Sequence, residues 1–160
     1  MYPAYAHIAA FMAEYFPTFS EYGQDPATVH LMHDFFAPDL QFVGYMGSPA
    51  GPLTYSSREA FLAYDVSHPW AYERLTPLDM TIDERRKMVF AIIDFEFVER
   101  ARERVVVRSL GAAQYQLALD EKSTIKIKKI LYFPQRQPPG ALSGGDVLGR
   151  PPAGWSEREG

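Results

Sequence analysis

The stretch Phe36-Ala-Pro-Asp-Leu-Gln-Phe-Val-Gly-Tyr45 decides the fold, because a helical pattern ends in it and a strand pattern begins. Apolar residues recur at helical spacing over residues 4–16 and 27–37, whereas residues 42–46 predict a short strand. The Ala-Pro-Asp break separates the two patterns, since proline is poorly tolerated inside a helix. Helices come first and most of the sheet follows, which is typical of a segregated α+β domain with a cupped sheet and a pocket.

Proline and helix-capping residues mark the ends of the three expected helices. Pro17 is expected to end the first helix, because its ring and its missing N–H group make continuation costly. Asp25 precedes a proline and is expected to cap the second helix. Ser56 or Ser57 is expected to cap a third helix over residues 56–66.

The second half of the chain has a β pattern, because β-branched and aromatic residues alternate there with polar ones. Successive antiparallel strands are therefore expected at residues 76–82, 88–98, 105–119 and 124–133. Polar hairpin tips join the later strands. A single domain over residues 1–134 follows from these elements, and the Pro- and Gly-rich residues 135–160 are expected to form a C-terminal tail.

Composition excludes several classes of function. The 160 residues are 47% hydrophobic, enough for one domain with a real core. A net charge of −4 argues against a nucleic-acid partner, and the absence of cysteine excludes disulfides, thiolate metal sites and a cysteine nucleophile. No apolar stretch approaches the length of a membrane span, so we expect a soluble, cytoplasmic protein without a membrane partner.

With these elements in place, the chain resembles the nuclear transport factor 2-like superfamily, which includes SnoaL-like polyketide cyclases, ketosteroid isomerases and scytalone dehydratase. The resemblance covers residues 4–133. It rests on the order of helices and strands, on Phe36-Ala-Pro-Asp39 at the first strand, and on Leu119-Asp-Glu-Lys-Ser-Thr-Ile125 at the last hairpin. It implies a cystatin-like α+β cone, in which a strongly curved mixed sheet wraps around the N-terminal helices. It also implies a hydrophobic small-molecule pocket that needs no metal and no organic cofactor.

Ketosteroid isomerases resemble the chain most closely around the first helix. Tyr15 in Phe11-Met-Ala-Glu-Tyr15 is similar to a tyrosine that donates a hydrogen bond to a developing enolate oxygen in that family. The family's proton-shuttling aspartate falls on Gly44, which cannot take a proton. Its protonated oxyanion-hole aspartate falls on Tyr115, whose phenol can still donate. The departure at Gly44 argues against steroid isomerisation and leaves ligand binding open.

Two groups of titratable residues have a functional and a structural interpretation. His68 precedes Pro69-Trp70 at the change from helix to sheet, where it could act as an acid or base near neutral pH; the alternative is a loop histidine without a chemical role. His30, His33 and Asp34 are spaced for a shared metal, but the apolar stripe of that helix lies elsewhere. An exposed helix face is the favoured interpretation, and no metal site is predicted.

The strand at residues 88–98 has one charged and one apolar face. Asp94 and Glu96 lie two residues apart and so share a face, where closely placed carboxylates can divide acid and base roles. The opposite face is uninterruptedly apolar and is expected to line the cone. We therefore expect both carboxylates on the outer side, paired with Arg108, or with Lys126 or Lys128.

The next strand leaves room on its inner face, because Ser109, Gly111 and Ala113 lie there beside Tyr115. A cavity explains this run of small residues, and close packing of the first helix is the alternative. The candidate ligand-binding residues along the inner surface are Phe11, Phe42, Tyr45, Trp70, Ile93, Phe95, Ala113 and Tyr132.

These observations predict a pocket protein that binds a hydrophobic or ring-containing small molecule. If it is an enzyme, the expected chemistry is a cofactor-independent isomerisation, dehydration or cyclisation, in which Tyr15 and Tyr115 polarise an oxygen and His68 is the base. The alternative is a non-catalytic ligand-binding or homodimeric assembly module. Outward apolar residues such as Phe90 and Leu110 would suit a homodimer.

Overall fold

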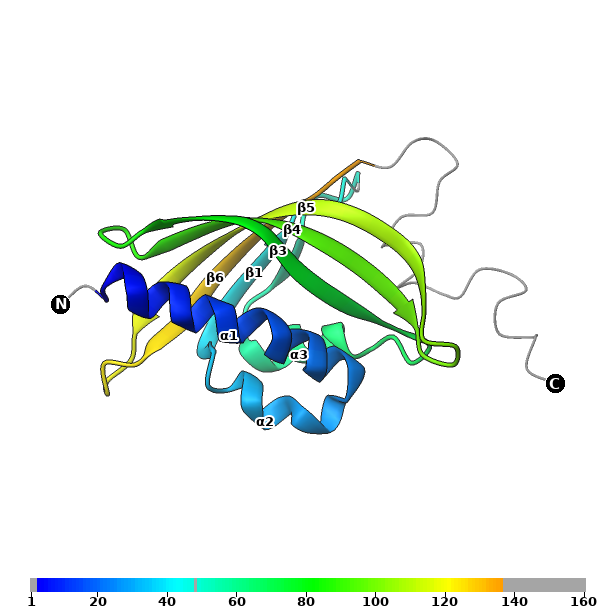
Figure 1. Cartoon of the computed structure of the whole chain (residues 1–160), viewed down its shortest axis with the longest axis horizontal. Helices are drawn as coiled ribbons and strands as arrows, with labels where there is room; N and C mark the ends of the chain where they lie inside the picture. The colour runs from blue at the N-terminus through cyan, green and yellow to red at the C-terminus, as the bar shows by residue number, and fades with distance from the viewer. Residues whose placement is uncertain (1–2, 48, 137–160) are drawn as a thin grey trace.

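The computed structural model describes residues 3–47 and 49–136, and it places helices on the concave side of one curved sheet (Figure 1). The helical elements are α1 (Tyr5–Gln24), a 3₁₀ turn η1 (Pro26–Thr28), α2 (Val29–Met32) and α3 (Arg58–Asp65). The strands are β1 (Phe36–Gly44), β2 (Leu53–Tyr55), β3 (Ala71–Asp83), β4 (Met88–Glu99), β5 (Arg104–Leu119) and β6 (Ile125–Pro134). Helices and sheet are segregated along most of the chain, so the predicted α+β class is confirmed.

The six strands form one mixed sheet in the order β2-β1-β6-β5-β4-β3. β1 pairs with β6 in parallel, and the other neighbours are antiparallel. The long strands arch over α1, with α2 and α3 on the same side of the sheet (Figure 1). No helix among the described residues is long and apolar enough to cross a membrane. The predicted tail lies outside the described residues from residue 137 onward.

The inner face of the sheet has the residues that the alternation predicts. On β4 the buried apolar side chains that alternate along the inner face are Val89, Ala91, Ile93, Phe95 and Phe97. On β5 they are Val107, Ser109, Ala113, Tyr115 and Leu117. On the outer face, Arg108 Nε donates to Asp94 Oδ1 at 3.0 Å, so the predicted outward pairing of Asp94 is confirmed. Glu96 also forms the expected ion pair with Arg108, whose Nε lies 4.0 Å from Glu96 Oε1, and Arg74 Nε donates to Glu96 Oε2 at 2.7 Å.

Helix α1 runs through Pro17 to Gln24, so the predicted end at Phe16 is wrong. The proline ring lies on the exposed side of the helix, where it displaces no core contact. Continuation buries Phe19 and Tyr22, and the Tyr22 hydroxyl donates to the carbonyl of Leu62 at 2.8 Å. Burial of two aromatic side chains outweighs the one backbone hydrogen bond that Pro17 cannot make.

The expected second helix over residues 27–37 is also wrong at its end, because β1 already begins at Phe36. The pairing of β1 with β6 shifts register between Phe36 and Gln41, and Pro38 lies in this irregular segment. A proline is tolerated there because a bulged strand does not need every ladder hydrogen bond. The predicted cap at Asp25 is confirmed by its side chain, which accepts from the Ala27 N–H at 3.1 Å.

The region after β1 differs from the prediction in two places. Residues 53–55 form the short strand β2 against β1, which the turn-rich sequence around them concealed. β3 begins at Ala71, five residues before the expected start at Thr76, and this extension carries Glu73 into the sheet. The cap of α3 is Ser57, one of the two serines expected, whose Oγ accepts from the Ala60 N–H at 3.1 Å.

Candidate functional site

A cavity of about 550 Å³ lies between the concave face of the sheet and the helices α1 and α3. Every strand and both of these helices contribute to its wall. The lining side chains used below are Tyr15, Phe19, Phe42, Phe61, Tyr64, Asp65, Glu73, Phe95, Ser109, Tyr115, Tyr132 and Arg136. A volume of this size suits a drug-sized organic ligand.

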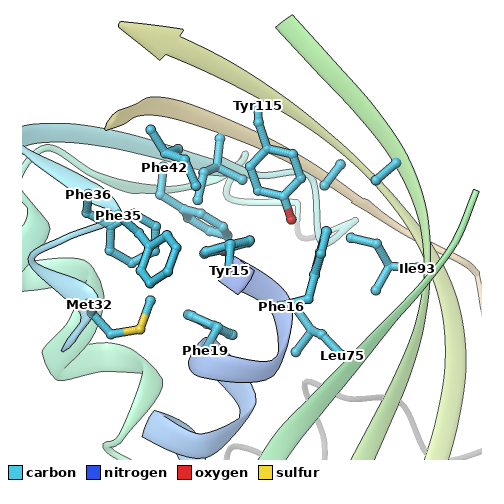
Figure 2. Packing of buried hydrophobic residues seen from close by; sticks show 14 of the residues in the cluster. Tyr15, Phe16, Phe19, Met32, Phe35, Phe36, Phe42, Leu75, Ile93 and Tyr115 are labelled. Atoms are coloured by element: carbon cyan, nitrogen blue, oxygen red, sulfur yellow. The ribbon is translucent and has the colours of Figure 1, made fainter. Parts of the chain in front are cut away.

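Aromatic rings form most of the wall and hold one another in place. Figure 2 shows Tyr15 on α1 among the rings of Phe19, Phe36 and Tyr115. The Tyr15 ring centroid lies 5.6 Å from that of Tyr115 and 5.8 Å from those of Phe19 and Phe36. Tilted and edge-to-face contacts of this kind stabilise a fixed ring arrangement beyond simple burial. This part of the wall is therefore mainly aromatic and preformed.

Two carboxyl groups face this aromatic cavity. Asp65 is the last residue of α3, and Glu73 is the third residue of β3. Strand alternation places Glu73 on the same face as the buried Ala71 and Leu75, which is why its side chain points inward. The Oδ2 atom of Asp65 is buried and accepts no hydrogen bond from the described residues.

Burial raises the pKa of both carboxyl groups. It raises the pKa of Glu73 to about 7. Burial also raises the pKa of Asp65 well above its usual range; the charge of Glu73 raises it further, and the charge of Arg100 lowers it. The negative charge of a Glu73 carboxylate therefore favours the protonated form of Asp65. A proton acceptor and a proton donor lie in one cavity at neutral pH.

The phenols of the cavity remain protonated. Burial raises the pKa of Tyr15, Tyr115 and Tyr132 well above the usual tyrosine value. Burial and then the charge of Glu73 raise the pKa of Tyr64 to about 12. Each phenol is therefore a hydrogen-bond donor at neutral pH, and Tyr15 and Tyr115 are close enough to perturb each other's pKa.

The structure brings seven of the eleven predicted site residues to the cavity wall: Tyr15, Tyr115, Phe42, Tyr45, Phe95, Ala113 and Tyr132. The other four lie behind the wall or away from it. Phe11 packs on Phe35 at 5.3 Å between ring centroids, and Ile93 is fully buried in the core. Trp70 accepts from the Arg100 N–H through its carbonyl oxygen, and His68 packs edge-on against Tyr64 at 5.3 Å.

Gly111 does not leave open space in the cavity, as the run of small residues around it suggested, but makes room for two aromatic rings. A Cβ atom there would lie 2.7 Å from Phe95 Cε2 and 2.9 Å from Tyr132 Cε2. The rings of Phe95 and Tyr132 thus fill the space that the glycine leaves, and the cavity lies beyond them. Its neighbours Ser109 and Ala113 do line the cavity.

Sequence reasoning missed Asp65 and Glu73, although each leaves a signal. A carboxylate in the last turn of a helix opposes the helix dipole, and Asp65 occupies such a position. Glu73 shares the alternation of Ala71 and Leu75, so an earlier start of β3 would have placed it inward. Among the described residues no group of His, Asp and Glu side chains is arranged to hold a metal ion.

Comparison with solved structures shows which known proteins share this fold. No family model and no curated protein sequence matches the chain. AusH from Aspergillus nidulans is similar in structure with a TM-score of 0.63 and 15% identity, over 93% of each chain. A predicted SnoaL-like polyketide cyclase from Jannaschia sp. CCS1 has a TM-score of 0.61 and 9% identity, over 84% of this chain and 90% of its own. Nuclear transport factor 2 from Cryptosporidium parvum has a TM-score of 0.58 and 9% identity, over 79% and 90%.

At these identities the likeness is one of fold. The resemblance to nuclear transport factor 2-like proteins is confirmed at that level, and so is the cystatin-like architecture with its curved mixed sheet. Activity has to be argued from the cavity itself.

Proposed function

We propose that the protein binds a hydrophobic, ring-containing small molecule in this cavity and catalyses a proton transfer within it. The reaction class is a cofactor-independent isomerisation, dehydration or cyclisation. The observation that carries the proposal is the pair Asp65 and Glu73, two partly buried carboxyl groups with raised pKa values that line an aromatic cavity. Titratable groups perturbed in this way are concentrated at catalytic sites.

In the proposed reaction Glu73 is the proton acceptor and Asp65 is the proton donor. Glu73 as a carboxylate takes a proton from a carbon of the ligand next to a carbonyl group, and the electron pair moves toward the carbonyl oxygen. Tyr15 and Tyr115 donate hydrogen bonds to that oxygen as its negative charge develops. Return of the proton to another carbon completes an isomerisation, and a proton from Asp65 to a departing hydroxyl completes a dehydration.

His68 is replaced as the base in this proposal. His68 is only 7% exposed, and its ring packs against Tyr64 rather than lining the cavity. Glu73 lines the cavity and has a pKa near neutrality, which suits a general base. His68 then supports the position of Tyr64.

A thermal-shift screen against ring ketones, phenolics, steroids and polyketide-like aromatics tests ligand binding directly. A ligand that binds the folded state alone raises the melting temperature in a saturable way, and we expect this for at least one class. Ligands found in this way are then assayed for turnover by wild type and by Glu73→Gln. No shift across the panel would contradict the proposed pocket function, and equal turnover by the variant would contradict the role of Glu73.

Tyr115→Phe is expected to weaken binding of an oxygen-bearing ligand and to leave stability nearly unchanged. The ring still packs against Tyr15, so the free energy of unfolding should change by less than about 1 kcal/mol. Loss of one hydrogen bond to the ligand should lower affinity by about 5-fold or more. Titration calorimetry and urea denaturation measure the two effects, and unchanged affinity would remove Tyr115 from the site.

The second candidate function, a homodimeric assembly, is favoured by an apolar row on the outer face of the sheet. Ile92, Ala112 and Phe133 pair in register across β4, β5 and β6, and Leu110 lies beside them with 43% of its surface exposed. An exposed apolar patch of this kind suits self-association.

If this face forms a dimer, light scattering at micromolar concentration should give twice the chain mass of 18.2 kDa. Leu110→Asp should return the protein to the monomer mass, because the new charge would be desolvated in the interface. Leu78→Asp, at an exposed leucine of the edge strand β3, is the matched control. A monomer mass for the wild type would contradict the assembly proposal and would not affect the proposal for the cavity.

A further inference from the structure

The charges that line the cavity are unevenly balanced. Asp65 and Glu73 are partly buried in the cavity wall, and among the described lining residues only Arg136 carries a positive charge. Arg136 is exposed to solvent, so its charge is screened by water. The enclosed part of the cavity therefore has acidic groups and no lining basic group among the residues described.

The cation whose charge acts on Asp65, Arg100, already has other hydrogen-bond partners. The Arg100 guanidinium donates to the carbonyl oxygens of Gly23 and Gln24 at 2.6 and 2.7 Å, and it lies 5.3 Å from the centroid of the Tyr72 ring. These contacts hold it at the C-terminal end of α1. Its charge lowers the pKa of Asp65 at a distance, but the structure shows no hydrogen bond between the two side chains.

Asp65 presents an acceptor that nothing among the described residues satisfies. Its Oδ2 atom is buried and accepts no hydrogen bond from them, and its side chain lines the cavity. Buried polar atoms in folded proteins almost always have a partner, since an unsatisfied one is costly. A ligand that brings a hydrogen-bond donor to this position would supply the missing partner.

The surrounding rings favour the same kind of ligand. The faces of aromatic rings carry partial negative charge and attract cations within about 6 Å, most strongly where water is excluded. The rings of Phe19, Phe61, Tyr64 and Tyr132 line the same cavity as the two carboxyl groups. A negatively charged ligand would meet like charge there and is excluded by it.

We propose that the ligand of this cavity is a ring-containing secondary or tertiary amine, bound as its ammonium ion, whose N–H group donates to Asp65 and whose charge lies against Glu73 and the aromatic rings. The inference deepens the proposed function, on which it rests, by naming the chemical class of the ligand. A neutral alcohol could also donate to Asp65, but it would gain nothing from the second carboxyl group or from the ring faces.

Binding of such a cation should be coupled to the release of protons from the cavity. The positive charge favours the ionised forms of Asp65 and Glu73, so binding should release about one proton where the carboxyl groups are partly protonated in the free protein. The groups that interact with this pair are Arg100, whose charge opposes the effect, and the phenols of Tyr15, Tyr22, Tyr64 and Tyr132, which stay protonated. A neutral ligand should release no proton.

The test compares N,N-dimethyl-1-naphthylmethylamine with the isosteric neutral alcohol 2-methyl-1-(1-naphthyl)propan-2-ol. Titration calorimetry at pH 6.5, in two buffers of different ionisation enthalpy, gives affinity and proton release together. We expect the amine to bind about tenfold more tightly and to release about one proton. Glu73→Gln should remove most of this preference and leave alcohol affinity within about twofold.

The matched control is Glu96→Gln, which makes the same change of side chain and charge on the outer face, where Glu96 pairs with Arg74. It should keep the preference for the amine, since its carboxylate does not face the cavity. Equal affinity for amine and alcohol without proton release would overturn the amine inference and leave the proposed pocket function standing. If neither probe binds and no compound of the thermal-shift panel raises the melting temperature, the amine inference and the proposed pocket function are both overturned.

Discussion

At pH 8, Glu73→Gln is expected to raise the free energy of unfolding by about 2 kcal/mol. Burial raises the pKa of Glu73 to about 7, so at pH 8 the folded wild type must hold a carboxylate that it solvates poorly. Each pKa unit corresponds to about 1.4 kcal/mol, and partial access to the cavity reduces the total. Glutamine has nearly the same shape and no charge, so the variant avoids this penalty.

The same shift sets a pH dependence of stability. The folded state keeps the Glu73 proton up to about pH 7, whereas the unfolded chain loses it near the ordinary glutamate value of 4.5. Stability therefore falls as the pH rises through this window and stays level with respect to Glu73 above it. Glu73→Gln should show a shallower fall, with a remainder from Asp65.

Urea denaturation at pH 5 and pH 8 measures both effects, with Glu96→Gln as the control. The Glu96 carboxylate has arginine partners on the outer face, and the substitution breaks its pair with Arg74, so the control should not be stabilised at pH 8. A Glu73→Gln variant that is less stable than wild type at both pH values would show that the Glu73 carboxylate is well solvated or paired in the folded state, and not destabilised by burial.

Phe36→Ala is expected to lower the free energy of unfolding by about 3–5 kcal/mol, the range for truncation of a buried aromatic side chain. Phe36 is completely buried, and its ring centroid lies 5.7 to 6.4 Å from those of Phe61, Tyr15 and Phe19. All three of these rings line the cavity. Removal of the ring behind them should therefore also weaken ligand binding in the fraction that remains folded.

Phe90→Ala is the control for this truncation, because Phe90 is 44% exposed on the sheet and the chemical change is identical. Its effect should stay within about 0.5 to 1 kcal/mol. Chemical denaturation of the two variants measures the difference. Similar losses for both would mean that Phe36 is not the packed support of the cavity wall.

The sheet was predictable from the sequence to a large extent, because alternation on β4 and β5 is long and regular. Which face of β4 is buried followed directly from Val89, Ala91 and Ile93. The helix-to-strand boundary was not predictable, since Phe35-Phe36-Ala37 fits either period and only pairing with β6 decides between them. The end of the first helix was mispredicted at Pro17 for a related reason. The sequence showed the local cost of a proline inside a helix, but it did not show that the aromatic residues after Pro17 are buried.

The candidate site was predictable only in its aromatic part. Tyr15 and Tyr115 were identified from a family resemblance, and both line the cavity. Asp65 and Glu73 were not identified, because a carboxyl group usually lies at the surface and a sequence does not show which few are enclosed. Their pairing depends on how the end of α3 meets the start of β3, which is a tertiary arrangement.

The most direct test of the central claim is a ¹³C NMR titration of the side-chain carboxyl groups between pH 3 and 9, with Asp65→Asn and Glu73→Gln used for assignment. We expect the Glu73 resonance to titrate near pH 7 and the Asp65 resonance to titrate well above the ordinary range of an aspartate, and each should respond to removal of the other. If both instead titrate independently between about pH 3 and 5, as solvated carboxyl groups do, the cavity holds no acid–base pair and the proposed proton transfer is contradicted.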